Sequence, residues 1–251
     1  MIAFHGETDI GRRRSLNEDT IHAGDDLFIV CDGMGGHKAG EVASRVATDV
    51  IAGFVKRSGE DSEITWPYGF EPQSSHDGNR LRNAVKLANR AVFAKSTSSD
   101  EYTGMGTTVA AVLVSRRRTQ MTYATVGDSR IYLIRPGAIV QLTRDDSWLN
   151  VAWEGETLDS STRASMKNVL TKALGSRQDV DFDVVGRELN EGDVVLLCSD
   201  GLTNMLGDDE ILQIVTPHGP DLERATQALI DAANANGGRD NVSAVLVRYT
   251  A

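Results

Sequence analysis

The sequence predicts an α+β fold in which antiparallel β-sheets are covered by helices, and three observations lead to this expectation. Blocks of short strand-like segments alternate with helix-like segments, without a strict β-α-β order. The strand-like segments are rich in β-branched and aromatic residues and are separated by short turns. No internal repeat, low-complexity tract or Pro/Ser-rich linker divides the 251 residues, so we expect one domain spanning residues 1–251.

The N-terminal part begins with short strands and continues with two helices. The strands are expected at Ile2–Thr8, Thr20–His22 and Leu27–Cys31. A helix is predicted to begin near Ala39, because apolar side chains recur on one face at helical spacing. These side chains are Val42, Val46, Val50 and Phe54, with Ile51 and Val55 beside them. A second helix, around residues 79–94, shows the same kind of spacing at Leu81, Val85, Ala88 and Val92.

The loop between these two helices has no clear periodicity, yet it contains three aromatic residues, Trp66, Tyr68 and Phe70. We interpret them as a small apolar cluster that packs the loop against the body of the protein. An exposed recognition surface is the alternative interpretation.

From Gly106 onward the pattern changes to strands that suggest an antiparallel meander. The four runs are "TTVAAVLVS", "TQMTYATVG", "SRIYLIR" and "AIVQLT", and the basic triplet 116–118 is expected in a hairpin turn. A polar stretch with weak helical character follows at residues 145–167. Strands are expected again at Asp181–Val185 and Asp193–Cys198. A helix with Leu222, Ala225, Leu229 and Ala232 facing inward then leads to the closing strand "VSAVLVRY".

Composition and charge argue against several classes of protein. The formal net charge of −10 disfavours binding to nucleic acid, whose partners usually carry a basic surface. No apolar run is long enough to span a bilayer, and the N-terminus has no apolar core, so we expect neither a membrane protein nor a signal peptide. Cys31 and Cys198 lie inside apolar runs without metal-type spacing, which predicts buried thiols in a reduced, cytoplasmic protein.

Four aspartates stand at the ends of apolar runs: Asp32, Asp128, Asp200 and Asp240. A carboxylate at the rim of the core costs several kcal/mol unless it is paired. Turn residues explain the Asp-Gly pairs only one at a time, and arginine partners are too few for all the acids. The alternative is a cluster of hard oxygen ligands for Mg²⁺ or Mn²⁺, and the five histidines show no paired ligand spacing. Gly33 would let the backbone turn sharply and offer its carbonyl to the ion.

Such a cluster has a chemical use. Two divalent ions about 3.5–4 Å apart activate a water for in-line attack on phosphorus. A substrate phosphate then needs a permanently charged, rigid fork, which arginine provides. Arg14 precedes Glu18 by four residues in "RRRSLNED", so one short segment carries both a fork and acids.

Six short motifs follow one another along nearly the whole chain. They are R-x-x-N-E-D at 14–19, DGMGG at 32–36, GTT at 106–108, VGDSR at 126–130, SDGL at 199–202 and DNVS at 240–243. Each motif is weak alone, but their order and spacing resemble the metal-dependent protein Ser/Thr phosphatases (type 2C-like, PPM). The DGMGG motif in a short chain resembles the bacterial branch of that family.

The resemblance implies a fold and a set of site residues. The fold would be a four-layer α-β-β-α sandwich, two antiparallel sheets flanked by helices, with a flap at about 145–167 beside the active site. Asp32 would bridge two metal ions (Mn²⁺ or Mg²⁺), the Gly33 carbonyl would ligate one of them, and Asp200 and Asp240 would complete the other site. Arg14 would bind the phosphate.

The remaining implied roles are auxiliary. Glu18 and Asp19 would act through metal-bound waters or as second-shell acceptors, and Asn241 would shape the loop beside Asp240. Asp128, with Asp200, matches the position that binds a third, weaker metal ion in bacterial relatives.

The sequence departs from the eukaryotic pattern at Met34, where those members carry a histidine proposed as general acid. A thioether cannot donate a proton, and His37 would begin a helix and point away, so a metal-bound water is the preferred acid. Trp148 and Trp153 in the flap either pack it onto the body, which we favour, or anchor substrate.

The expected function is hydrolysis of phosphoserine and phosphothreonine in proteins by a water that two metals activate, without a phosphoenzyme. The alternatives are a phosphoprotein-binding module without activity and a two-metal hydrolase of small phosphates. The expected partners are phosphorylated proteins, with a bacterial Ser/Thr kinase and its substrates as the analogy suggests, and the chain is expected to be a monomer.

Overall fold

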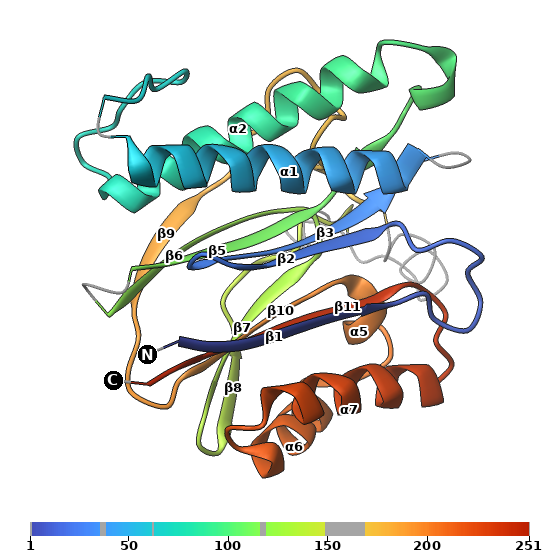
Figure 1. The fold of residues 1–251 in the computed structure, drawn as a ribbon. Helices are drawn as coiled ribbons and strands as arrows, with labels where there is room; N and C mark the ends of the chain where they lie inside the picture. Colours follow the sequence, from blue (N-terminus) through green and yellow to red (C-terminus); the bar gives the residue numbers. More distant parts are fainter. Residues whose placement is uncertain (1, 36–38, 62, 116–118, 149–168, 251) are drawn as a thin grey trace.

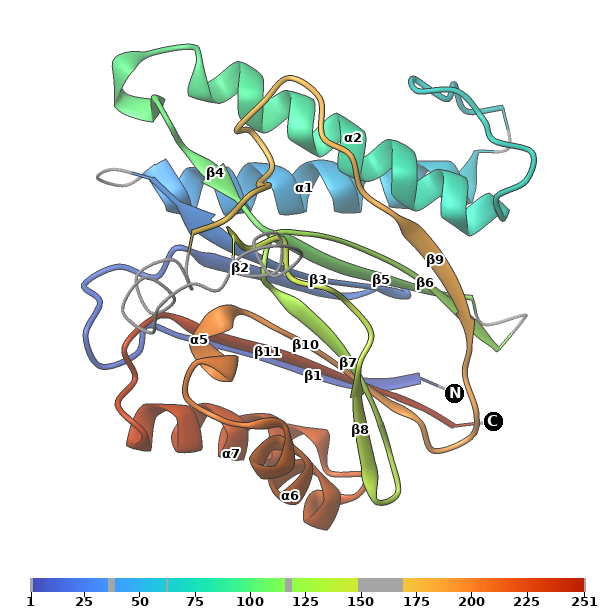
Figure 2. The same ribbon diagram turned by 180° about the vertical axis from the view of Figure 1, so that it is seen from behind.

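The computed structural model describes residues 2–35, 39–61, 63–115, 119–148 and 169–250, and the structural statements below concern these residues. The chain forms two antiparallel β-sheets that lie face to face, with helices on both outer faces (Figures 1 and 2). This is the predicted α+β, four-layer α-β-β-α sandwich. No helix in these residues is long and apolar enough to cross a membrane.

The first sheet has the strand order β1-β11-β10-β7-β8. Its strands are β1 (Ile2–Asp9), β11 (Val242–Tyr249), β10 (Val194–Cys198), β7 (Arg130–Arg135) and β8 (Ala138–Gln141). The second sheet has the order β2-β3-β5-β6-β9, and β4 pairs with the end of β3. Its strands are β2 (Asp19–Gly24), β3 (Leu27–Met34), β4 (Gly106–Thr107), β5 (Val109–Ser115), β6 (Gln120–Val126) and β9 (Val184–Glu188).

Helices cover the outer face of each sheet. Two long helices, α1 (Ala39–Glu60) and α2 (His76–Ser96), lie over the second sheet (Figure 1). The short 3₁₀ helix η1 (Asp100–Tyr102) follows α2. On the other side, the first sheet is covered by α5 (Asp200–Thr203), α6 (Asp208–His218) and α7 (Leu222–Ala235).

The interior strands β3 and β10 are buried on both faces. Alternate residues of β3 enter different layers: Ile29 packs under the helices, whereas Phe28 packs between the sheets. In β10, Leu196 faces the helices and Leu197 faces the other sheet. A strand that is covered on both sides reads as a continuous apolar run. This burial explains the runs "LFIVC" and "VVLLC", and both cysteines in them are buried free thiols as predicted.

The expected antiparallel meander is wrong in one respect, because it is divided between the two sheets. β5 pairs with β6 in the second sheet, while β7 pairs with β8 in the first. The chain crosses between the sheets at Gly127, which has a φ of 101°. A Cβ on Gly127 would lie 2.7 Å from Thr108 Cγ2. This crossing carries Asp128 to the end of the sandwich.

Other elements differ from the prediction in detail. The buried face of α1 is centred on Ala43, Ala47 and Ile51, and the predicted stripe at Val42, Val46 and Val50 is only half-buried. Small residues line this face because helix and sheet approach closely there. β9 begins at Val184, three residues later than the strand expected at Asp181.

The helix α6 was not expected from the sequence. It begins with three acidic residues and contains Pro217 in its last turn, and only Ile211 and Val215 are buried in it. So short an apolar face leaves little periodic signal. The aromatic loop agrees with the packing interpretation, since the Trp66 ring contacts the rings of Phe54 and Phe70.

Candidate active site

The predicted acids meet at one end of the sandwich, where the central strands of both sheets stop. Asp32 lies near the C-terminal end of β3, opposite Asp19, the first residue of β2. Asp200 begins α5 two residues after the end of β10, and Asp240 lies two residues before the start of β11. Residues from the ends of four strands and from the Gly127–Ser129 crossing therefore share one small region.

The electrostatics show how closely these carboxylates interact. Burial raises the pKa of Asp32 well above its usual value, and the charges of Asp19, Asp200, Asp128 and Asp240 raise it further. Because each carboxylate opposes the ionisation of the others, the cluster holds more negative charge than its surroundings neutralise.

The pKa values of three further acids, Asp19, Asp128 and Asp200, are raised as well. Burial raises the pKa of Asp128 to about 7, with a contribution from Asp200. Burial also raises the pKa of Asp19 to about 6, although hydrogen bonds from Ser243 and Ser199 oppose the rise. The pKa of Asp200 is raised by burial and then by Asp240.

Several oxygens in the cluster have no hydrogen-bond partner among the described residues. These buried atoms are Glu18 Oε1, Asp19 Oδ1 and Asp200 Oδ1. A buried carboxylate oxygen without a partner is costly, and a divalent cation would satisfy it. The donor set consists of carboxylates without histidine or cysteine, which suits Mg²⁺ or Mn²⁺ and does not suit Zn²⁺.

In the described part of the chain, no three Asp, Glu, His or Cys side chains lie close enough together to coordinate one ion. The same carboxylates nevertheless have unpartnered oxygens and repel one another, as groups that bind a cation do. A buried cluster of like charges is unfavourable by several kcal/mol per group unless a counter-charge joins it. The residues present therefore fit a divalent-ion centre.

Two threonines fix the backbone of Asp32. The Asp32 amide donates to Thr108 Oγ1 (2.9 Å), and the Asp32 carbonyl accepts from the Thr108 amide and the Thr107 hydroxyl, both at 2.9 Å. Thr108 Oγ1 lies 2.6 Å from the hydroxyl of Ser129, the residue after Asp128. The GTT motif thus ties together the strand end that carries Asp32 and the crossing that carries Asp128.

Asp19 and Asp200 are held by neutral side chains. Asp19 Oδ2 accepts hydrogen bonds from the hydroxyls of Ser199 (2.8 Å) and Ser243 (2.6 Å), which come from the other sheet. Asn204 donates to Asp200 Oδ2 at 2.9 Å. Because these donors are uncharged, they orient the carboxylates without neutralising them.

Asn241 orders the loop beside Asp240, as the resemblance implies. Its side-chain oxygen accepts from the Glu18 amide (2.9 Å), and its side-chain nitrogen donates to the carbonyls of Ile10 (3.0 Å) and Leu16 (2.9 Å). One asparagine therefore positions both ends of the segment that carries Arg14 and Glu18.

The glycines after Asp32 and Asp200 are explained by close approach of the backbone. A Cβ on Gly33 would lie 2.1 Å from the Gly40 carbonyl oxygen at the start of α1. A Cβ on Gly201 would lie 1.9 Å from the Asn241 carbonyl oxygen. Neither glycine is among those with positive φ, so the sharp turn expected at Gly33 is wrong. Any larger residue would push apart the segments that bring the acids together.

Arg14 lies at the rim of the cluster. Its Nη2 donates to Asp240 Oδ2 at 2.7 Å, and its Nη1 is 4.0 Å from Glu18 Oε2. The hydrogen bond that Arg14 donates to Asp240 is the largest cause of the raised pKa of Arg14. Since 48% of this side chain is exposed, part of the guanidinium remains accessible to an anion from solvent.

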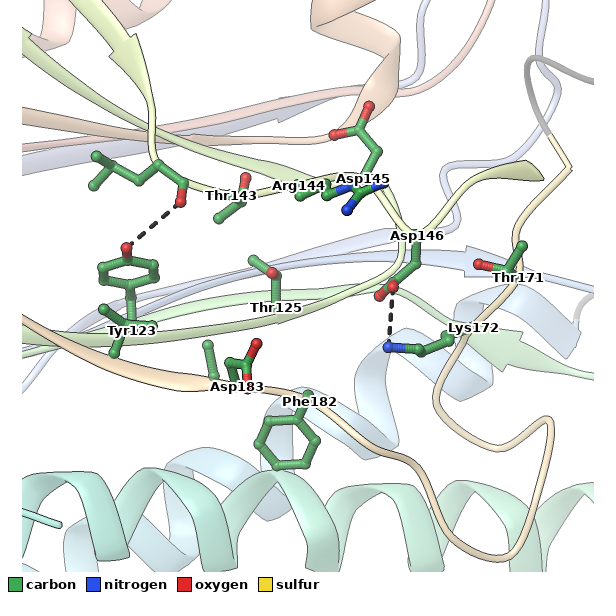
Figure 3. A pocket seen from close by; sticks show the side chains of 13 residues that line it. Tyr123, Thr125, Thr143, Arg144, Asp145, Asp146, Thr171, Lys172, Phe182 and Asp183 are labelled. Atoms are coloured by element: carbon green, nitrogen blue, oxygen red, sulfur yellow. Dashed lines mark hydrogen bonds and ion pairs between the residues drawn. The ribbon is translucent and has the colours of Figure 1, made fainter. Parts of the chain in front are cut away.

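A cavity of about 540 Å³ lies elsewhere, on the flank where β6 and β9 of one sheet face the segment after β8 of the other (Figure 3). Two of its acids are paired. Arg130 makes two-pronged contact with Asp145, and Lys172 Nζ lies 3.2 Å from Asp146 Oδ1 (Figure 3). Asp146 also receives the Gly127 amide at 3.2 Å and donates its own amide to the Gly127 carbonyl at 2.8 Å. The flank cavity is therefore joined to the crossing that carries Asp128.

Only the base of the expected flap at 145–167 can be described. The Trp148 amide donates to the Val169 carbonyl at 2.9 Å. The Trp148 side chain is 47% exposed, so the expectation that it packs onto the body is wrong. His37, Trp153 and residues 149–168 lie outside the described residues, as does the turn expected at 116–118.

Some supporting residues received no role from the sequence, namely Thr107, Thr108, Ser199, Asn204 and Ser243. Four of them belong to the motifs GTT, SDGL and DNVS. The sequence did contain a feature that could have identified these residues, because most of them are small polar residues next to an acid or a glycine at the end of a buried strand. Asn204 follows Asp200 by one helical turn, which is the spacing of side chains on one helix face.

Fold and site together define a class: a four-layer α-β-β-α protein with a carboxylate-rich cation site at one end of the sandwich. A family model described as protein phosphatase 2C matches residues 10–247. A putative protein phosphatase 2C-type of Streptococcus pyogenes is 35% identical over 249 residues, which are 96% of this chain and 95% of that protein. The chain belongs to the protein phosphatase 2C family.

Two further comparisons concern the serine/threonine protein phosphatase PstP. The protein from Mycobacterium tuberculosis is 33% identical over 98% of this chain, which corresponds to 45% of the length of PstP. A crystal structure of the PstP catalytic domain in complex with two manganese ions is similar with a TM-score of 0.82 and 31% identity, covering 100% of this chain and 99% of that one.

Proposed function

We propose that this protein hydrolyses phosphoserine and phosphothreonine in phosphorylated proteins, as a manganese-dependent phosphatase whose catalytic domain spans residues 1–251. The observation that carries the proposal is the cluster of buried and half-buried, mutually repelling carboxylates with unpartnered oxygens, directly beside an arginine that is accessible from solvent. This combination provides for cations and for a phosphate in one site. The names of the relatives support a protein substrate.

The metal site would be formed by Asp32, the Gly33 carbonyl, Asp200 and Asp240, with Asp128 as a candidate for a third ion. Two divalent ions held there supply a water of lowered pKa as the attacking group and offset the charge of the phosphate. Magnesium would suit the same oxygen donors. The paired manganese ions in the PstP structure support this assignment.

The chain itself binds and orients. Arg14 would hold the phosphate through its exposed N–H groups, while Asp240 fixes the guanidinium. Thr107 and Thr108 hold Asp32, so that its carboxylate keeps its direction when substrate binds. Met34 has no proton to give, so the leaving serine or threonine oxygen must take its proton from water. The described residues of the site include no serine, threonine or cysteine with an adjacent histidine or lysine as general base, and direct attack by water without a phosphoenzyme is therefore proposed.

The test is turnover of a phosphothreonine peptide by protein that has been stripped of metal with EDTA and then supplied with Mn²⁺ or Mg²⁺. We expect activity only with added metal, and more activity on the phosphopeptide than on nucleotides or small phosphate esters. A preference for the small esters would favour a small-phosphate hydrolase. Binding of phosphopeptide without any turnover would favour a module that only recognises phosphoproteins.

Arg14→Gln separates phosphate binding from metal binding. We expect KM for the phosphopeptide to rise by about tenfold or more, the value of one charge-assisted contact. The manganese concentration that gives half-maximal activity should change less. A larger change in metal dependence than in KM would contradict the role proposed for Arg14. By analogy with the family, the substrates would include a Ser/Thr kinase and its targets, and the protein would act as a monomer in the cytoplasm.

A further inference from the structure

Three arginines beside Arg14 have no role in the site described so far. Arg12 and Arg13 precede it in the segment after β1, and Arg239 precedes Asp240 in the loop before β11. All three side chains are exposed. Within the described residues, none of the three is within ion-pair or hydrogen-bonding distance of a carboxylate, unlike Arg14, Arg130 and Arg135.

The two loops that carry these arginines are fastened to each other. The Arg12 amide donates to the Gly238 carbonyl at 2.7 Å, and Asp9 Oδ1 accepts from the Gly11 amide (2.8 Å) and from the Asn234 side chain (2.9 Å). A Cβ on Gly238 would lie 2.7 Å from Arg12 Cγ, so the Arg12 side chain starts directly against this loop. The cationic positions are therefore set by an ordered backbone.

The same backbone places the arginines next to the active site. A Cβ on Gly11 would lie 2.1 Å from the Asp240 carbonyl oxygen. Asp240 in turn holds Arg14, the residue that would bind the phosphate. Arg12, Arg13 and Arg239, which we call the arginine rim, thus belong to the two loops that meet at Asp240, next to the residue proposed to bind the phosphate.

The charge of the rim is unusual for this protein. The chain has a formal net charge of −10, which would repel an acidic phosphoprotein. Exposed charges are screened beyond a Debye length of about 8 Å at physiological ionic strength, so an approaching peptide responds to the local charges. Three exposed arginines that pair with no carboxylate among the described residues add positive charge locally, beside the loop that carries Asp240.

We propose that the arginine rim selects substrates whose phosphoresidue is flanked by further negative charge, either acidic side chains or a second phosphate. This inference rests on the proposed phosphatase function. Guanidinium groups bind carboxylate and phosphate oxygens in the same two-pronged manner, so both sources of charge fit the rim. Exposed ion pairs each change an affinity by a factor of about 1.4 to 5, so three arginines acting together produce a measurable preference.

The experiment compares kcat and KM for three phosphothreonine peptides of equal length, with neutral flanks, with Asp/Glu flanks and with a second phosphothreonine. The rim variant is Arg12→Gln/Arg13→Gln/Arg239→Gln. The matched control is Arg57→Gln/Arg90→Gln/Arg177→Gln, which removes three exposed arginines on or near α1 and α2. A third variant replaces the rim arginines by Lys and keeps the charge.

We expect wild type to show a lower KM for the two anionic peptides than for the neutral one. The rim variant should raise KM for the anionic peptides by about fivefold or more, the product of three exposed contacts. The kcat of the rim variant and its KM for the neutral peptide should stay within about twofold of the wild-type values. The neutral flanks offer the rim arginines no anionic partner, and a single exposed contact to the phosphate changes the affinity only slightly. The control should behave as wild type, and the Lys variant should recover part of the preference. Comparing the two anionic peptides then shows whether phosphate or carboxylate is the better ligand.

Equal KM values for all three peptides in wild type, or a rim variant that changes all of them alike, would overturn the proposal while leaving the phosphatase function intact. If the control variant lost the preference for anionic peptides to the same extent, the proposal would also be overturned, because the net charge of the protein would then explain the preference. If wild type hydrolyses none of the peptides with Mn²⁺, the proposed function fails, and the selectivity fails with it.

Discussion

The acid cluster at the end of the sandwich and the cavity on its flank are both built from aspartates near strand ends, but they treat charge in opposite ways. On the flank, Asp145 is paired with Arg130 and Asp146 with Lys172. In the cluster, Asp19 and Asp200 are held by serine hydroxyls and an asparagine amide, which carry no charge. Arg14 supplies one guanidinium at the rim, against Asp240.

This difference distinguishes acids that stabilise the fold through salt bridges from acids whose charge remains available to a ligand. A salt bridge on the flank neutralises its carboxylate within the folded chain. The neutral donors in the cluster fix the direction of each carboxylate and leave its charge available for a cation. Buried groups with strongly raised pKa values in such an arrangement are typical of functional sites.

The largest effect is expected from replacing a cluster acid. Asp32→Asn should lower kcat/KM for a phosphothreonine peptide by about a thousandfold or more, because losing a metal ligand forfeits several kcal/mol of transition-state stabilisation. The same change removes one of the repelling charges around Asp19, Asp128, Asp200 and Asp240. We therefore expect the metal-free variant to unfold at a urea concentration equal to or above that of metal-free wild type.

This result sharpens the comparison, because the activity falls while the stability does not. Activity within tenfold of wild type would contradict the assignment of Asp32. A strong loss of stability in the metal-free variant would mean that Asp32 is structural, as the flank acids are.

The next effect is stabilisation by manganese. At a free concentration 100 times the dissociation constant, a ligand that binds only the folded state adds about 2.7 kcal/mol to the free energy of unfolding. For a chain of this length that corresponds to a rise in Tm of about 5–10 °C. Differential scanning calorimetry of EDTA-treated protein with and without Mn²⁺ measures it. Asp145→Asn should keep the shift, whereas Asp32→Asn should lose most of it; equal shifts in both variants would place the ions elsewhere.

The position of the acid cluster at the strand ends was largely predictable from the sequence, because strand ends and acidic residues are local features of the chain. Continuous apolar runs that stop at Asp32 and Asp200 indicated buried strands with carboxylates at the rim, and the structure has both. The motif order supplied the fold. The metal and phosphate roles of individual residues stay predictions.

The supporting contacts were not predictable, since they join residues far apart in the chain. Ser199 and Ser243 bind Asp19 from 180 and 224 residues away. Sheet membership was equally hidden: β7 is buried on both faces, so its side chains do not alternate in polarity and cannot indicate which sheet it joins. The buried face of α1 was predicted in part, since Ile51, Phe54 and Val55 are buried as expected. At the start of the helix the buried positions are Ala43 and Ala47, and the valines beside them are half-buried.

A smaller effect is expected on the flank. Asp145→Asn leaves the Arg130 guanidinium, whose side chain is only 25% exposed, without its carboxylate. Breaking such a pair should lower the free energy of unfolding by about 2 kcal/mol, less than for a fully buried pair because solvent reaches the arginine. Urea denaturation measures the loss, and kcat at a temperature well below the Tm should stay within a few-fold of wild type. A thousandfold loss of activity would show that the flank cavity belongs to the catalytic site.

The smallest effect is a pH dependence that metal removes. In the unfolded chain aspartate has a pKa near 3.8, whereas in the folded protein burial raises the pKa of Asp128 to about 7 and that of Asp19 to about 6. The folded state therefore binds these protons more tightly, and its stability falls as the pH rises through this window.

For metal-free protein, we expect Asp128 to lower the free energy of unfolding by roughly 1–2 kcal/mol between pH 5 and pH 8, after allowance for solvent screening. Asp128→Asn should remove that part of the slope in urea titrations, while Asp145→Asn should reduce it only in part, because the Asp145 charge contributes to the raised pKa of Asp128. Saturating Mn²⁺ should abolish or reverse the slope, because a cation binds the ionised carboxylates and competes with protons. If metal-free wild type were instead more stable at pH 8 than at pH 5, and Asp128→Asn left that profile unchanged, the cluster would already be neutralised within the chain, and its contrast with the flank would disappear.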